Sequence, residues 1–211
     1  MERGLFISLE GPDGSGKSTQ IEFLKTYFEE LGLPCVFTRE PGGTPISEKI
    51  RAIILDKENS EMDDMTEALL YAASRAQHVA EKIRPALSEG KIVICDRYVD
   101  SSIAYQGYGR QMGSQVAEIN AYATMGCMPD LTILIEVDPR VGKKRIAAGE
   151  RDRLESERIR FHDRVLSGYR KLAEEDPDRV IPVDGTGSRE EIRDTIRGYV
   201  DAALRAKGYI E

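Results

Sequence analysis

Short apolar runs and longer segments of helical spacing follow one another along the whole chain. The apolar runs predict strands at residues 5–9, 35–38, 91–96, 131–137 and 180–183. The last run contains Pro182, which has no backbone N–H to donate, so this strand should lie at an edge. Strands that alternate with helices predict an α/β fold, in which helices cover both faces of a parallel sheet.

Capping signals and apolar spacing indicate the helices. Helices should begin at Thr44 with Pro45, at Asp138 with Pro139, and at Ser188 with Glu191. Apolar spacing predicts further helices directly after residue 19 and over 161–172. A long helix should run from about residue 66 to residue 84, and Pro85 should break or kink it. We expect residues 101–107 to form a loop that leads into a helical turn.

The segment between the first strand and the first helix is rich in glycine. It reads Gly11, Pro12, Asp13, Gly14, Ser15, Gly16, Lys17, Ser18 and Thr19, and it matches the pattern GxxxxGK[ST]. Glycines let successive backbone N–H groups surround phosphate oxygens at the positive end of a helix. We therefore expect Lys17 to reach the outer phosphates of a nucleotide and Ser18 to bind Mg²⁺. The alternative is an ordinary glycine-rich turn, which the flanking strand and helix disfavour.

A carboxylate and an arginine close the apolar run 91–96. Asp96 ends this strand, where a P-loop enzyme places an Asp near its Mg²⁺. The fork of Arg97 suits two phosphate oxygens. Ligands of parallel sheets bind outside the carboxyl ends of the strands, so the glycine-rich segment and Asp96 should meet in one crevice.

Two other segments carry groups that suit a nucleoside. On the long helix Tyr71, Ser74, Arg75 and His78 form one stripe. An aromatic ring one turn from an arginine can stack on a base while the arginine binds the edge of that base. By spacing alone, an ordinary surface stripe is the more common explanation. The segment 101–107 combines hydroxyl, amide and aromatic groups, which suit sugar and base recognition.

Basic residues concentrate between residues 140 and 160. Arg145, Arg151 and Arg153 lie around Gly149, between two helical patterns. Such a turn is typical of a mobile lid, which brings charge to a triphosphate and excludes water. A solvated charged hairpin is the alternative, because acidic residues are interspersed with the basic ones.

Composition excludes several classes of protein. The chain has 211 residues, of which 40% are hydrophobic and 32% charged, as in a soluble globular protein of one domain with a lid. The net charge of -7 argues against a surface that coats nucleic acid. No apolar stretch approaches the roughly 18 residues of a membrane span, so we expect a cytoplasmic protein without a membrane partner. Cys35, Cys95 and Cys127 are expected to be buried reduced thiols.

Taken together, the motifs resemble those of the thymidylate kinase (dTMP kinase) family, within the P-loop nucleoside-monophosphate kinases. The matching segments, in family order, are 11–19, 39–44, 69–78, 96–98, 101–107 and 152–155. The resemblance implies a P-loop NTPase fold with a five-stranded parallel sheet, as a single kinase domain over 1–211 with a small lid at about 142–155. It also implies a homodimer that uses Mg²⁺ to transfer the γ-phosphoryl group of ATP to dTMP, giving ADP and dTDP for dTTP synthesis.

The resemblance implies roles for individual residues as well. Asp13 would hold the 3′-hydroxyl of dTMP, Tyr71 would stack on thymine, and Arg75 would bind the edge of the base. Arg39, Arg51 and Arg97 would hold the acceptor phosphate or bridge to the donor. Ser102, Tyr105 and Gln106 would shape the base and sugar pocket. The catalytic arginine of the lid would be Arg145, Arg151 or Arg153.

The chain departs from the family pattern at three positions. Gly14 stands where some members carry an arginine, so the basic lid would have to supply that charge, as in the bacterial subgroup. Tyr71 stands where Phe is usual and Ser74 where Asp is frequent, which puts base selectivity in question more than the chemistry. No histidine is nominated as a base, because a phosphate acceptor is already largely ionised.

Other functions stay open at this point. A related P-loop kinase could act on dUMP, on another pyrimidine monophosphate or on a nucleoside. A switch that hydrolyses GTP is less favoured, because the guanine-reading pattern [NT]KxD is not found in the sequence. A structural protein that merely keeps the fold is disfavoured by the number of matching segments.

Overall fold

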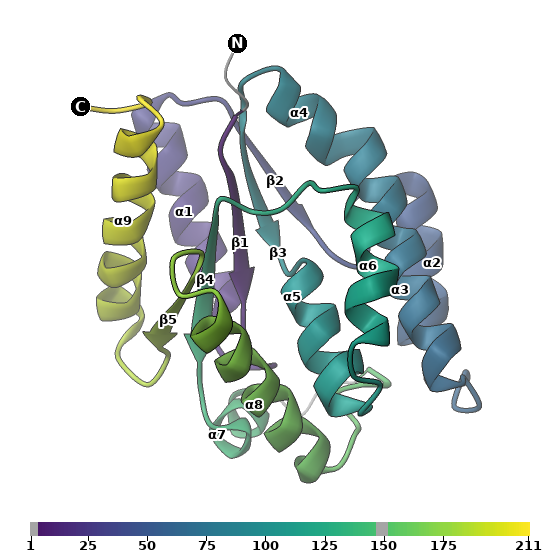
Figure 1. The fold of residues 1–211 in the computed structure, drawn as a ribbon. Helices are drawn as coiled ribbons and strands as arrows, with labels where there is room; N and C mark the ends of the chain where they lie inside the picture. Colours follow the sequence, from purple (N-terminus) through teal and green to yellow (C-terminus); the bar gives the residue numbers. More distant parts are fainter. Residues whose placement is uncertain (1–3, 147–151) are drawn as a thin grey trace.

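The computed structural model describes residues 4–146 and 152–211, which form a five-stranded sheet between two layers of helices (Figure 1). The strands are β1 (Phe6–Glu10), β2 (Cys35–Arg39), β3 (Ile92–Asp96), β4 (Leu131–Glu136) and β5 (Val180–Asp184). Their spatial order is β2-β3-β1-β4-β5, and each neighbouring pair is parallel. The predicted α/β fold is confirmed, and β5, which contains Pro182, is an edge strand as expected.

Helical segments connect the strands and cover both faces of the sheet (Figure 1). In chain order they are α1 (Lys17–Leu31), α2 (Pro45–Leu55), α3 (Asp64–His78), the π-helical η1 (Val79–Ile83), α4 (Arg84–Ser88), α5 (Val99–Ser102), the π-helical η2 (Ile103–Gly109), α6 (Gln115–Thr124), α7 (Pro139–Arg145), α8 (Ile159–Glu175) and α9 (Arg189–Ala206). Apolar side chains of α1 and α9 pack on one face of the sheet. Those of η1, α4 and α8 belong to clusters on the other face.

The three predicted helix starts have the expected caps. The side chain of Thr44 accepts a hydrogen bond from the backbone of Ser47, and that of Asp138 accepts one from Arg140. Ser188 forms the complete capping box with Glu191. These caps depend on residues only a few positions apart, which explains why the sequence pattern locates them.

The structure differs from the sequence prediction in three segments. Pro85 does not end the long helix, because α3 passes through the wider π-helical turns of η1 and continues to Ser88. In η1 the N–H of Arg84 reaches the carbonyl of Val79, five residues back, which makes room for the proline ring. The segment 101–107 is helical in α5 and η2 rather than a loop, and α6 was not predicted at all.

Close packing against α8 explains why η2 is helical despite its glycines. A side chain at Gly109 would lie 2.7 Å from the ring of Phe161, and one at Gly168 would lie 2.7 Å from Tyr108. The two helices can therefore approach closely only because these positions lack a Cβ. The hydroxyl of Tyr105 in η2 contacts Asp13 and Arg97, which follow β1 and β3, so η2 lies beside the carboxyl ends of these strands.

Candidate active site

The glycine-rich loop between β1 and α1 has the backbone that its sequence predicts. Gly11, Gly14 and Gly16 have φ angles of 141°, 74° and 101°, which are unfavourable for residues with a side chain. A Cβ at Gly14 would also collide with the carbonyl of Gly142 in α7. The loop is thus shaped by its glycines and supported from outside by α7.

Lys17 lies folded into this loop. Its Nζ donates hydrogen bonds to the carbonyls of Gly11, at 3.0 Å, and Pro12, at 3.1 Å, and the side chain is buried. Burial, followed by the nearby charge of Arg97, lowers the pKa of Lys17 to about 8. An anionic ligand in the loop would favour the protonated form, so the site is arranged to receive negative charge.

A groove of about 550 Å³ opens beside the loop, large enough for a nucleotide. It is lined by loop residues 14–20, by residues 187–189 and by Arg145. The Nη1 of Arg145 donates to the carbonyl of Gly185 at 2.9 Å, which holds this side chain at the groove. Of the three predicted lid arginines, Arg145 therefore lies where a donor phosphate chain would lie.

The residues predicted to bind Mg²⁺ share one surface. Ser18 and Asp96 both line a further groove, which is adjacent to the donor groove at Ser18 and lies beside α1 and the end of β3. Within the described part of the chain, Oδ1 of Asp96 is buried without a hydrogen-bond partner. Residues 4–146 and 152–211 contain no cluster of three or more His, Cys, Asp or Glu side chains that could enclose a metal. This arrangement fits Mg²⁺, which is usually bound by one or two protein ligands together with phosphates and water.

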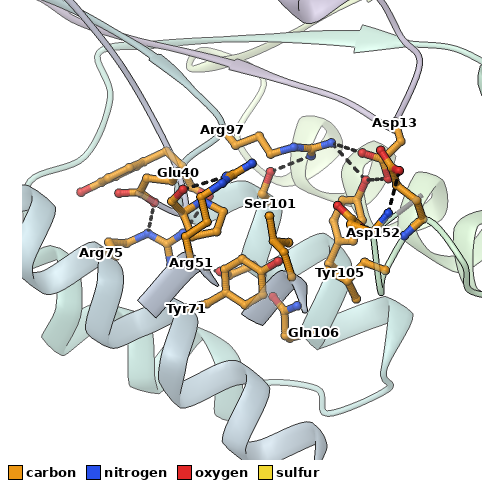
Figure 2. Close-up of a pocket in the computed structure, with 16 residues that line it drawn as sticks. Asp13, Glu40, Arg51, Tyr71, Arg75, Arg97, Ser101, Tyr105, Gln106 and Asp152 are labelled. Carbon is orange, nitrogen blue, oxygen red and sulfur yellow. Dashed lines mark hydrogen bonds and ion pairs between the residues drawn. The ribbon is translucent and has the colours of Figure 1, made fainter. Parts of the chain in front are cut away.

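A second cavity, of about 170 Å³, lies on the other side of the loop (Figure 2). Eight of the nine residues predicted to bind the acceptor line it: Asp13, Arg51, Tyr71, Arg75, Arg97, Ser102, Tyr105 and Gln106. They come from the glycine-rich loop, α2, α3, the end of β3, α5 and η2, which are far apart in the sequence. The cavity therefore exists only in the folded chain.

Asp13 and Arg97 form the polar end of this cavity (Figure 2). Nη2 of Arg97 donates to Oδ1 of Asp13 at 2.7 Å, and the hydroxyl of Tyr105 donates to Oδ2 at 2.8 Å. Burial alone would raise the pKa of Asp13, but the charges of Arg97 and Lys17 hold it below its ordinary value. Asp13 is thus an ionised acceptor that connects the loop to the cavity.

The side chain of Arg75 is almost completely used by protein acceptors. Its Nε donates to Glu40 at 2.8 Å, its Nη1 to Ser102 at 3.0 Å and to Asn120, and its Nη2 to the Tyr98 carbonyl at 3.0 Å. Since a guanidinium has five N–H groups, one is left for a ligand. Arg75 is therefore a rigid part of the cavity wall.

Two groups in the wall differ from Arg75 in having unused hydrogen-bonding capacity. Nε2 of Gln106 donates to Glu67 at 2.8 Å, while its Oε1 is buried without a partner among the described residues. Burial, followed by the charge of Glu67, raises the pKa of Tyr71, so its hydroxyl stays protonated. The wall thus offers a ligand an acceptor at Gln106 and an aromatic ring at Tyr71.

Some predicted residues lie elsewhere. Arg39 is outside the acceptor cavity; it pairs with Glu48 at 2.9 Å and lines the groove that contains Ser18 and Asp96. Arg39 was expected to hold the acceptor phosphate or to bridge to the donor, and this role stays a prediction, since its side chain lies outside the acceptor cavity and beside the predicted Mg²⁺ ligands.

The lid arginines also separate. Arg153 does not line the donor groove: its Nε donates to the Ile54 carbonyl at 3.0 Å, and its Nη2 to Glu67 at 2.6 Å. In this arrangement Arg153 fastens the C-terminal end of the predicted lid to α2 and α3 instead of facing the donor groove. Arg151 lies outside the described residues.

Sequence reasoning gave no individual role to several polar residues that support the cavity. Glu10, Glu40, Glu67, Ser101 and Tyr169 all make hydrogen bonds to its predicted members or to their neighbours. Glu10 could have been found, because a carboxylate that closes an apolar run is the same signal that singled out Asp96. Tyr169 carried no such signal, since its spacing on α8 is that of a core residue.

Comparisons with known proteins agree with this geometry. The family model described as thymidylate kinase matches residues 9–196, which is most of the chain. The chain belongs to the thymidylate kinase family. It is 47% identical to a thymidylate kinase of Clostridium novyi, over 95% of this chain and 100% of that protein. It is 52% identical to one of Enterococcus faecalis, over 89% of this chain and 91% of that protein.

A solved structure of the thymidylate kinase family shows the same fold. The crystal structure of thymidylate kinase from Ehrlichia chaffeensis matches with a TM-score of 0.77 and 32% sequence identity. The match covers 94% of this chain and 99% of that one. Family membership and the P-loop NTPase fold therefore rest on sequence and structure alike.

Proposed function

We propose that this member of the family transfers the γ-phosphoryl group of ATP to dTMP, giving ADP and dTDP for dTTP synthesis. The observation that carries the proposal is the junction of two cavities at one loop. The donor groove is lined by Lys17 and Ser18, and the acceptor cavity on the other side is lined by Asp13 of the same loop. A donor and an acceptor phosphate can therefore meet at the loop, which phosphoryl transfer between them requires.

The charges at this junction suit a transfer between two phosphates. Lys17 and Arg97 are near enough for the charge of Arg97 to lower the pKa of Lys17. Two cations held close together are unfavourable alone, but they neutralise the negative charge that two phosphates bring into one space. Arg51 lines the acceptor cavity and adds a third positive charge. We assign Arg97 and Arg51 to the acceptor phosphate, and Lys17 and Arg145 to the donor.

Base and sugar recognition are assigned to the opposite end of the cavity. Tyr71 would offer its ring for stacking, and Oε1 of Gln106 would accept a hydrogen bond from an imino N–H such as that of thymine, which its lack of a partner among the described residues supports. Asp13 and Tyr105 form the sugar end, where the Asp13 carboxylate would accept a hydrogen bond from a ribose hydroxyl.

Mg²⁺ is the metal that this site would hold. When bound, it would supply positive charge that neutralises the donor phosphates. Ser18 and Asp96 would hold it, as the unpaired Oδ1 of Asp96 supports. The phosphate acceptor needs no general base, so His78, which is bonded to Glu40 and Thr38, is given only a structural role.

An acceptor panel tests the proposed function. The purified protein is assayed for ADP formation with ATP and Mg²⁺, using dTMP, dUMP, CMP and thymidine in turn. We expect dTMP to be used with the highest kcat/KM. A preference for dUMP would support the related-kinase alternative, and no turnover with dTMP would overturn the proposal. Hydrolysis of GTP without stimulation by any acceptor would point to a nucleotide switch instead.

We also propose that the protein acts as a homodimer through α3 and α6. Leu69 on α3 is 50% exposed, Tyr122 on α6 is 85% exposed, and Met125 at the end of α6 is 47% exposed. The two helices lie side by side at one flank of the molecule (Figure 1). Large apolar side chains gathered on one flank are typical of a surface that a second copy covers. Light scattering of the wild type and of Tyr122→Glu would show a dimer that the substitution weakens.

Two further expectations stay proposals. We propose a single kinase domain with a small lid between α7 and α8, and part of that lid lies outside the described residues. Within residues 4–146 and 152–211, no helix is long and apolar enough to cross a membrane. We propose the cytoplasm as the site of action, because ATP and deoxynucleotides are used there.

A further inference from the structure

Glu10 is a fully buried carboxylate at the end of β1, and three donors converge on it. Its Oε1 accepts a hydrogen bond from the backbone N–H of Tyr98 at 2.6 Å. Its Oε2 accepts one from the Ser101 hydroxyl at 2.5 Å and one from the Tyr169 hydroxyl at 3.0 Å. A buried charge is costly unless it is well bonded, so this set of donors requires an explanation.

The same two hydroxyls also contact Arg97. Nη1 of Arg97 donates to Ser101 Oγ at 3.1 Å and to the Tyr169 hydroxyl at 3.2 Å. A hydroxyl has a single hydrogen, and the ionised Glu10 carboxylate is able to accept the hydrogens of both hydroxyls. The oxygen lone pairs then face the guanidinium. Glu10 thereby keeps both hydroxyl hydrogens directed away from Arg97.

Glu10 also supports the backbone at Arg97. The φ angle of Arg97 is 66°, in the left-handed region that costs energy for a residue with a side chain. The N–H that Glu10 accepts belongs to Tyr98, the next residue, so this hydrogen bond stabilises the strained turn. One carboxylate therefore holds both the backbone and the guanidinium of Arg97.

We propose that Glu10 is a positioning residue for the acceptor phosphate, which it serves by holding Arg97 through Tyr98, Ser101 and Tyr169. The proposal rests on the proposed function, in which Arg97 binds the phosphate of dTMP. Nη2 of Arg97 is directed at Asp13 and Tyr105, on the cavity side, while Nη1 is occupied by the two hydroxyls. Glu10 itself does not line the cavity.

The surroundings of Glu10 set the conditions for a test. Burial, followed by the charge of Asp100, raises the pKa of Glu10 to about 7, while Ser101 and Arg97 oppose the rise. The charged and titratable groups that face it are Asp100 from α5, Arg97 from the end of β3, Cys95 within β3, Tyr169 from α8 and Lys17 from the phosphate loop. Binding should therefore be measured at about pH 8, where Glu10 is ionised.

Glu10→Gln is the informative substitution. A glutamine that accepts the Tyr98 N–H with its oxygen must turn its NH₂ group toward the hydroxyls of Ser101 and Tyr169. The two hydroxyl hydrogens then lose their acceptor. The hydroxyls lie 2.8 Å apart, so one hydrogen can point at the other oxygen, and the second is directed toward the N–H groups of Arg97. The size of the side chain is preserved while the direction of the network changes.

The experiment compares dTMP with thymidine, which lacks the phosphate. Calorimetry gives the affinity of each ligand for the wild type and for Glu10→Gln, with thermal unfolding as a check on folding. We expect dTMP affinity to fall by about tenfold or more, as for a disturbed charged hydrogen bond, and thymidine affinity to stay unchanged. Equal losses for both ligands, or no loss for dTMP, would overturn the positioning role.

A second pair of variants keeps the test valid if Glu10→Gln folds poorly. Tyr169→Phe removes one hydroxyl between Glu10 and Arg97, and it should weaken dTMP binding several-fold without affecting thymidine. Tyr27→Phe is the matched control, since the Tyr27 hydroxyl also donates to a carboxylate, that of Asp201, on the other face of the sheet. If the wild type binds dTMP no more tightly than thymidine, the proposed function fails and this inference fails with it. If the wild type prefers dTMP over thymidine and the variants keep the same preference, the proposed function stands and only this inference fails.

Discussion

Glu67 joins the C-terminal end of the predicted lid to the base end of the acceptor cavity, and removing its charge should lower stability. The side chain has no exposed surface, and it accepts hydrogen bonds from Gln106 at 2.8 Å, from Arg110 at 3.0 Å and from Arg153 at 2.6 Å. Burial alone would raise the pKa of Glu67, but Arg110 and Gln106 hold it below its ordinary value. Glu67 is therefore a buried carboxylate that stays ionised.

The perturbation is Glu67→Gln, which removes the charge and keeps the size. An amide has only one acceptor oxygen, so its NH₂ group would face a guanidinium. Removing the charge of one partner in a buried ion pair lowers the free energy of unfolding by about 3–5 kcal/mol. Arg110 keeps its ion pair with Glu157, and Arg153 keeps the Ile54 carbonyl, so we expect the lower end, a loss of about 3 kcal/mol in the free energy of unfolding.

Urea unfolding at about pH 7 measures this loss through the shift in midpoint at constant slope. Glu174→Gln is the control, because Glu174 is 69% exposed and its ion pair with Lys171 should contribute less than about 1 kcal/mol. The Glu67 variant should also raise the KM for dTMP, since Gln106 loses its partner. A loss no larger than that of the control, with unchanged KM, would refute the reasoning.

Three further predictions concern the phosphate loop and its neighbours. Lys17→Ala should abolish transfer, and turnover near the wild-type rate would overturn its assignment. Gly14→Ala should lower the melting temperature and the affinity for ATP, because its φ of 74° and the carbonyl of Gly142 exclude a Cβ; unchanged melting would contradict this. The raised pKa of Glu10 implies stability that is fully present below its unfolded pKa of 4.5 and is lost as pH rises through about 7. Relative to Glu10→Gln, the wild type should therefore lose about 3 kcal/mol between these limits in urea unfolding, and parallel pH curves would refute this.

The family resemblance predicted a set of acceptor residues that the local sequence pattern could not. Eight of the predicted residues meet in one cavity, although they come from segments between Asp13 and Gln106. The resemblance supplied that set, because spacing alone left Tyr71 and Arg75 as a possible surface stripe. It did not show that Arg75 is mostly occupied by Glu40, Ser102 and Asn120.

Local interactions determined what the sequence by itself could predict about this protein. The strands, the caps and the glycine-rich loop depend on residues that are neighbours in the chain, so a pattern of a few positions was enough. The continuation of the long helix through η1, and the helical form of η2, were decided by packing that outweighs proline and glycine preferences.

Only the tertiary structure decided which charges are available to a ligand. Arg145 and Arg153 are both arginines of the same basic segment. Arg153 is nevertheless held by Glu67, away from the donor groove, whereas Arg145 is held at that groove by the Gly185 carbonyl. Glu10 and Tyr169 lie 159 residues apart and share a hydrogen bond. A hydrogen bond is a property of two partners, and partners so far apart along the chain are brought together only by the fold.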